Sequence, residues 1–269
     1  MTKPWHGLCR IANIAADDES PLTAYLFPLQ PPKSQTMNQT PFNAAAPTAT
    51  TDASYVFNVL ILDESGSMGS IASAAKEVFE GYLHRLIQEQ QDIPDLTQYI
   101  NMWTFGKPYV NENIPLVKIN TWDKVFPEYR PSGNTPMFDA IGMSIHKLKE
   151  SLRILDLQKE QYQVKVFIVS DGEENASKEY SARQIGALIR GLIAEGWAFD
   201  YYGTDHDITS MADTLNIESN RRVMFQKSKA GMESARDHYM DEIIKEKMNF
   251  MESRRSESSR KFDNDERKA

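Results

Sequence analysis

The chain has 269 residues, of which 41% are hydrophobic and 10% aromatic, and its formal net charge is −8 at pH 7. This composition is sufficient for one large domain or two small ones with a hydrophobic core. The negative charge argues against a general binder of nucleic acid or anionic membrane surfaces, because it repels phosphates. The single cysteine, Cys9, excludes an intramolecular disulfide framework and any metal site made of several cysteines.

The first 53 residues are predicted to form an extension and linker. Residues 30–52 are rich in Pro, Thr, Ala and Asn without a period, which is linker composition. The N-terminus has no continuous apolar segment of the signal-peptide type, and no stretch approaches the roughly 20 apolar residues of a membrane span. We therefore expect a cytoplasmic protein with no membrane partner.

From residue 54 onward, short apolar runs alternate with helical periods, which is typical of parallel βαβ units. Residues 55–62 are nearly all apolar, as in a central strand covered on both faces. Residues 98–106 and 109–119 are predicted to form a hairpin with an antiparallel edge strand. Further strands are predicted at 162–171, 197–204 and 222–226, and helices at 71–86, 137–155, 180–196, 208–217 and 229–250.

The predicted fold is α/β: a Rossmann-like, doubly wound and mostly parallel sheet with one antiparallel edge strand and helices on both faces. Residues 54–228 are expected to form this domain. Residues 229–269 would add a closing helix and a tail of mixed charge, whose composition is typical of solvated or disordered chain.

Polar residues follow three of these predicted segments. Asp63 ends the first strand, and Ser65 and Ser67 come directly after it in "LDESGSMGSI". Thr135 precedes the second helix, and Asp171 ends the strand "VFIVSDG". Ligands of open α/β sheets bind at the carboxyl ends of the strands. Two carboxylates and three hydroxyls are therefore predicted to meet at one edge of the sheet.

Three chemistries compete for such a set: a nucleophile, a phosphate-binding loop or a hard metal ion. The chain has neither a G-x-x-x-x-G-K-[ST] loop nor a G-x-S-x-G elbow around its serines. Phosphatases of the haloacid-dehalogenase type use a first-strand Asp as nucleophile and an acid two residues later, but here that position is Ser65. An all-oxygen set suits Mg²⁺, and also Mn²⁺ or Ca²⁺.

The ordered set resembles the metal-ion-dependent adhesion site (MIDAS) of von Willebrand factor A (vWA) domains. The five positions of that motif are matched by Asp63, Ser65, Ser67, Thr135 and Asp171. The resemblance covers residues 55–226, and the strings "DESGSM", "GNTPMFDAIG" and "SDGEENASKEY" look most like stand-alone bacterial and phage-encoded vWA proteins. It implies a vWA fold, and it leaves open a place in bacterial stress or defence systems or beside AAA+ ATPases.

Each residue type also has a purely structural interpretation. The serines are suited to cap the helix that begins near Ser70, and Thr135 followed by Pro136 is a good helix N-cap. Charged residues near the motif are often simply solvent-facing. Asp205, His206 and Asp207 could form a second ion site or line the ligand groove, but they suit better a loop with an Asp helix cap. The residues expected at the rim of the ligand site are Glu64, Met68, Asn134, Glu173 and Asp205.

The function that these features predict is a non-enzymatic adaptor or scaffold. A divalent cation, Mg²⁺ or else Mn²⁺ or Ca²⁺, would capture an Asp or Glu carboxylate of a partner protein, with no nucleic acid involved. Two alternatives stay open: a metal-dependent phosphoryl-transfer enzyme that uses Asp63, and a structural assembly subunit in which the metal only holds loops together. The oligomeric state is not encoded in any pattern of the sequence.

Overall fold

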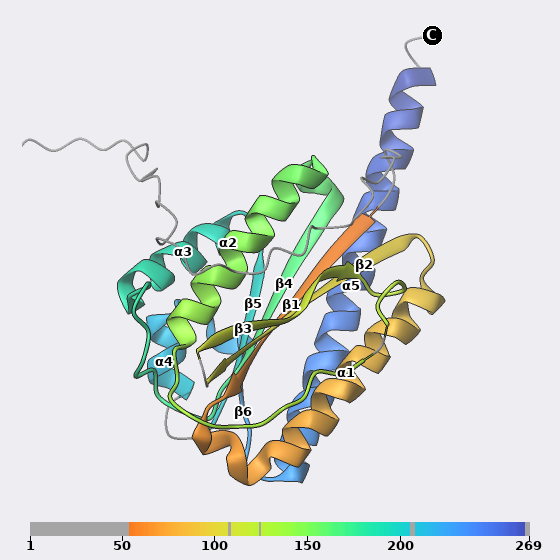
Figure 1. The fold of residues 1–269 in the computed structure, drawn as a ribbon. Coiled ribbons are helices and arrows are strands. Elements are labelled where there is room, and N and C mark those ends of the chain that lie inside the picture. Colours follow the sequence, from red (N-terminus) through yellow and green to blue (C-terminus); the bar gives the residue numbers. More distant parts are fainter. Residues whose placement is uncertain (1–53, 107–108, 124, 205–207, 267–269) are drawn as a thin grey trace, which may run out of the picture. The chain divides into compact units, whose positions relative to one another are not determined.

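The computed structural model describes residues 54–266, except 107–108, 124 and 205–207, so the predictions for residues 1–53 and Asp205 lie outside the described residues. The strands form one six-stranded sheet in the order β3-β2-β1-β4-β5-β6 (Figure 1). Their bounds are Ser54–Glu64 (β1), Leu96–Gly106 (β2), Val110–Lys118 (β3), Tyr162–Val169 (β4), Ala198–Gly203 (β5) and Arg222–Met224 (β6).

The strand directions confirm the predicted fold class. The strand β3 pairs with β2 in antiparallel fashion, and the other neighbouring strands are parallel. Every residue of β1 is buried, because β1 lies between β2 and β4 and is covered on both faces. An apolar run with no alternation is what such a strand requires.

Helices cover both faces of the sheet. On one face, α2 (Met137–Leu155), α3 (Ala182–Ala194) and α4 (Ile208–Thr214) share an apolar cluster with the sheet (Figure 1). On the other face, α1 (Ala72–Asp92) and α5 (Lys229–Glu266) contribute to a second apolar cluster. The chain therefore has two core layers, as a doubly wound sheet requires.

The helix α5 is longer than the sequence predicted. We expected the helix to end near Phe250 and a solvated tail to follow, but the helix continues to Glu266 and its last turns extend beyond the sheet (Figure 1). The sequence of this extension contains Glu, Arg and Lys, whose intrinsic helix propensities are high. Within the described part of the chain, no helix is apolar and long enough to cross a membrane.

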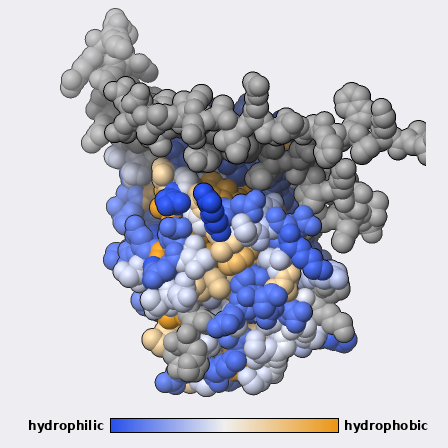
Figure 2. Space-filling view, turned by 90° about the vertical axis from the view of Figure 1, so that its left-hand side faces the viewer, coloured by the Kyte–Doolittle hydropathy of each residue, from blue (hydrophilic) through white to orange (hydrophobic). Residues whose placement is uncertain are grey.

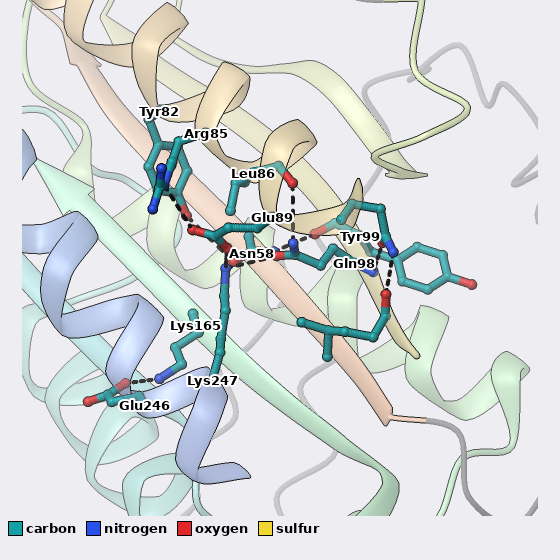
Figure 3. A network of polar contacts seen from close by, with 12 residues as sticks. Asn58, Tyr82, Arg85, Leu86, Glu89, Gln98, Tyr99, Lys165, Glu246 and Lys247 are labelled. Carbon is teal, nitrogen blue, oxygen red and sulfur yellow. Dashed lines mark hydrogen bonds and ion pairs between the residues drawn. The ribbon is translucent and has the colours of Figure 1, made fainter. Parts of the chain in front are cut away.

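A buried polar network joins α5 to α1 and the sheet (Figure 3). The ammonium of Lys247, which is 1% exposed, donates to the carboxylate of Glu89 on α1 and to the side-chain oxygen of Gln98 on β2, both at 2.8 Å. The preceding residue, Glu246, pairs with Lys165 of β4. Two adjacent residues of α5, one basic and one acidic, thus form ion pairs with α1 and with β4, respectively.

Figure 2 shows the left-hand side of the view in Figure 1, which is the side of α2, α3 and α4. On its coloured part, hydrophilic side chains surround several separate apolar areas. Scattered apolar side chains of this kind are normal for a protein surface and do not by themselves mark a docking site.

Candidate metal site

The parallel pairing of β1 and β4 brings the two predicted aspartates to the same edge of the sheet. In the register of these strands, Leu62 lies opposite Val169. Asp63 therefore continues β1 at the level where Ser170 and Asp171 follow β4. Both carboxylates come from the carboxyl ends of neighbouring strands, where the sequence placed the site.

Asp63 is fully buried, and each of its carboxylate oxygens accepts a hydrogen bond. The backbone N–H of Ser65 donates to Oδ1 and the hydroxyl of Ser170 donates to Oδ2, both at 2.6 Å. Burial raises the pKa of Asp63 from 3.8 to about 6; the charge of Asp171 raises it further, and the hydrogen bonds from Ser170 and Ser65 lower it. Asp63 thus carries a charge that the protein alone stabilises poorly.

The three predicted hydroxyls complete the candidate site, and two of them lie close to Gly172. The Oγ atoms of Ser65 and Ser67 lie 2.9 Å apart, and Ser67 donates to Oδ1 of Asp171 at 2.5 Å. A Cβ atom added to Gly172 would lie 3.2 Å from Oγ of Ser67, 3.6 Å from Oγ1 of Thr135 and 3.9 Å from Oδ2 of Asp63. The structure therefore brings the five predicted residues together, and the missing side chain at Gly172 leaves space beside their oxygens.

The capping interpretation of the serines is not what the structure shows. Ser65 precedes the 3₁₀ helix Gly66–Ile71, but its side chain makes no capping hydrogen bond there, and α1 begins only at Ala72. The two hydroxyls instead bond to each other, and that of Ser67 also donates to Asp171. They face the candidate site.

The alternative interpretation of Thr135, as the cap of α2, is not what the structure shows. The residue at the N-cap position is Pro136, and no side chain of that position makes a capping bond. The free N–H groups of the first turn are satisfied by the β4–α3 loop: Phe138 donates to the carboxylate of Glu174 at 2.9 Å, and Asp139 donates to the Ser177 hydroxyl at 3.0 Å. A second loop does the capping, which leaves the hydroxyl of Thr135 free for the site.

The predicted rim residues divide into three groups. Met68 is 0% exposed and packs in the core, so its prediction as a rim residue is wrong; it lies on the inner side of the 3₁₀ helix. Glu64 is 8% exposed and accepts from the backbone N–H of Arg130 at 2.6 Å, so it holds a loop. Asn134 and Glu173 are exposed beside the site, and Asp205 lies outside the described residues.

Three residues around the site were not predicted from the sequence. Ser170 orients Asp63, and the Tyr129 hydroxyl donates to the backbone oxygen of Asp63, while burial strongly raises the pKa of Tyr129. The ammonium of Lys227 lies 2.7 Å from Oδ2 of Asp171. Of the three, only Ser170 had a sequence signal, because it directly precedes Asp171 at the end of a predicted strand.

The donor set fits a hard divalent cation. It contains only oxygens, from two carboxylates and three hydroxyls, which is the chemistry that Mg²⁺, Mn²⁺ or Ca²⁺ selects. Oδ2 of Asp171 is buried without a hydrogen bond, although it is within ion-pair distance of Lys227. Among the residues that the structure describes, no group of three or more His, Cys, Asp or Glu side chains is arranged for a metal, so the candidate site depends on its hydroxyls as well as its two carboxylates.

Comparisons with known proteins support the fold. No protein-family model matches the chain, and no curated protein does. The solved structures that resemble it include the open conformation of the pilus adhesin SpaC from Lactobacillus rhamnosus GG, with a TM-score of 0.53 and 14% identity over 72% of this chain. The chain spans only 30% of that adhesin.

Two further matches are to isolated domains. The SpRpn10 VWA domain has a TM-score of 0.46 and 15% identity, over 66% of this chain and 92% of that domain. The vWF domain of the type V pili tip protein Mfa5 from Porphyromonas gingivalis has a TM-score of 0.48 and 10% identity, over 71% of this chain and 95% of that domain. At 14% identity, the likeness to the adhesin SpaC concerns the fold alone.

Proposed function

We propose that the chain is a vWA-type binding module that captures a carboxylate of a partner protein through a divalent cation. The observation that carries this proposal is the convergence of Ser67, Thr135 and Asp63 around the open side of Gly172. Asp171 joins the same cluster through Ser67. Three separate loops deliver oxygen ligands to one point, a placement that helix capping and loop packing do not explain.

The character of the ligands favours recognition of an anion. The cation would be held by the hydroxyls of Ser65, Ser67 and Thr135 and by the carboxylates of Asp63 and Asp171, directly or through water. Hydroxyl ligands are neutral, so a bound divalent ion stays electron-poor and supplies a Lewis-acidic position for an incoming carboxylate. Ser67 is exposed while both carboxylates are buried, so the open position would face solvent.

A phosphoryl-transfer enzyme is the less favoured alternative. A nucleophilic Asp63 would have to be reached by a phosphoryl group, but the residue is 0% exposed. The general acid expected two residues later is replaced by Ser65, whose hydroxyl is bonded to Ser67. The absence of catalysis, the cytoplasmic location and a role in a bacterial stress, defence or ATPase-associated system stay predictions.

The test is a calorimetric titration of the chelator-treated full-length protein with Mg²⁺ and Mn²⁺. We expect one ion to bind to the wild type, and Ser67→Ala to bind it at least tenfold more weakly. Ser73→Ala is the matched control, because Ser73 is an exposed serine on α1 that bonds only to Glu77. Absence of binding at millimolar metal, or equal loss in both serine variants, would contradict the proposal.

Partner capture is tested separately with the metal-loaded protein. The wild type should retain a protein from its native cell lysate in Mg²⁺, release it on chelation, and lose it in Asp63→Ala. Free acetate or glutamate at high concentration should compete, because the proposed contact is a carboxylate. If chelation lowers the melting temperature of the domain, but the protein that is still folded at the assay temperature retains its partner unchanged, the metal only holds loops together and the structural alternative holds.

A further inference from the structure

One side chain near the candidate site is a cation. Lys227 lies between β6 and α5, and its ammonium is 2.7 Å from Oδ2 of Asp171. The carboxylate is 0% exposed, whereas the Lys227 side chain is 41% exposed and reaches the site from the solvent side. The other oxygen of Asp171, Oδ1, accepts from Ser67. The two oxygens of Asp171 are thus divided between the hydroxyl cluster and Lys227.

We infer that Lys227 is a charge-setting residue of the metal site: its ammonium offsets the charge of Asp171 and so weakens the binding of a divalent cation. This inference rests on the proposed function and concerns its regulation. Asp63 and Asp171 together carry two negative charges, and Lys227 reduces the net charge at the site to about one. A cation bound there would stay further under-neutralised and would attract an anionic ligand more strongly.

The ion pair also has a role without metal. Two buried carboxylates repel each other, and the charge of Asp171 is one cause of the raised pKa of Asp63. A cation that belongs to the chain relieves this repulsion when no metal is bound. The neighbouring Lys229 does not share this role, because it pairs with Glu77 on α1 and both side chains are about half exposed.

The experiment compares Lys227→Met with Lys229→Met in the chelator-treated full-length protein. We expect Lys227→Met to bind Mg²⁺ about tenfold more tightly than the wild type, since one positive charge beside a divalent ion is removed. The melting temperature of its metal-free form should fall by about 2–4 °C, because Asp171 loses its counter-ion. Lys229→Met should change neither quantity by a comparable amount.

Two further variants separate charge from structural damage. Lys227→Arg keeps the positive charge and should keep the Mg²⁺ affinity within about twofold of the wild type. Lys227→Gln is a second neutral variant, which should repeat the tighter binding and which replaces Lys227→Met if that protein does not fold. Structural damage alone would weaken metal binding, so a gain in affinity is a specific readout.

The possible outcomes distinguish the inference from the proposed function. Equal Mg²⁺ affinity in the wild type and in both neutral Lys227 variants overturns the inference and leaves the metal site in place. No Mg²⁺ or Mn²⁺ binding by the wild type or by any variant overturns both. Binding by the neutral variants that exceeds that of the wild type and of Lys227→Arg supports both.

Discussion

Replacing Asp63 by Asn removes one buried negative charge while nearly conserving the shape of the side chain. In the wild type, the carboxylate is 0% exposed and accepts from the backbone N–H of Ser65 and the hydroxyl of Ser170. The Asn oxygen can still accept from Ser65, and the Ser170 hydroxyl can rotate to accept from the new amide. We therefore expect Asp63→Asn to be more stable than the wild type without metal, although it should lose the metal.

The magnitude follows from the pKa of Asp63. Folding raises this pKa from 3.8 to about 6, and each unit corresponds to about 1.4 kcal/mol at a pH above both values. The ionised Asp63 therefore lowers the free energy of unfolding by about 3 kcal/mol, which Asp63→Asn should recover. For a chain of this size, that corresponds to a rise in melting temperature of about 6–12 °C.

The assay is thermal unfolding at pH 7.5 in chelator and again in excess Mg²⁺. In chelator, Asp63→Asn should melt above the wild type; in Mg²⁺, the wild type should gain stability and the variant should not, because ligand binding stabilises only the form that binds. If Asp63→Asn melts below the wild type in chelator, Asp63 is a structural hydrogen-bond acceptor and the reasoning fails. If Mg²⁺ stabilises both proteins equally, the ion binds elsewhere.

Three further predictions concern pH and packing. The pKa of Asp63 in the folded protein is raised, so its contribution to stability is fully present below about pH 3.8 and is lost as the pH rises through about 6. Without metal, the difference in melting temperature between the wild type and Asp63→Asn should therefore vanish near pH 4 and reach its full size above pH 7. Lys247→Ala should lower the free energy of unfolding by about 3–5 kcal/mol in urea titrations, because the buried carboxylate of Glu89 loses its ammonium partner and keeps only the longer contact to Arg85. The double variant Lys247→Met with Glu89→Leu should recover most of the loss. Glu174→Ala should lower the free energy of unfolding by about 2–3 kcal/mol and also weaken metal binding, because Glu174 accepts from the N–H of Phe138 and holds the loop beside the site. A change in the free energy of unfolding below about 0.5 kcal/mol would show that water replaces these bonds.

The fold and the candidate ligands were predictable because each depends on a local pattern. The apolar runs of β1 and β4 mark strands covered on both faces, and parallel strands place the residues that follow them at one edge. Once Asp63 and Asp171 were assigned to strand ends, their proximity followed from topology. The same logic placed the hydroxyls of Ser65 and Ser67, which are only two and four residues from Asp63.

The errors arose where a residue depends on a loop whose path is not encoded locally. Thr135 has the sequence of a helix cap, but Glu174 and Ser177 reach the helix terminus from a loop almost 40 residues later. Met68 was placed on the rim because it follows the motif, yet the turn of a 3₁₀ helix carries it into the core. Lys247 is buried because it pairs with Glu89 on another helix. Periodicity alone predicts that lysines lie on the solvent side, and it does not show such a partner.

The carboxylates at this edge of the sheet fall into two sets with different consequences for mutation. Asp139 accepts from three successive backbone N–H groups, those of Lys178, Glu179 and Tyr180, and Glu174 also accepts from backbone donors. These charges are satisfied by the chain itself, so they build the loop and leave little attraction for a cation. The charges of Asp63 and Asp171, by contrast, repel each other. Lys227 offsets only part of this repulsion, so a cation is expected beside this pair and not at the more acidic loop next to it.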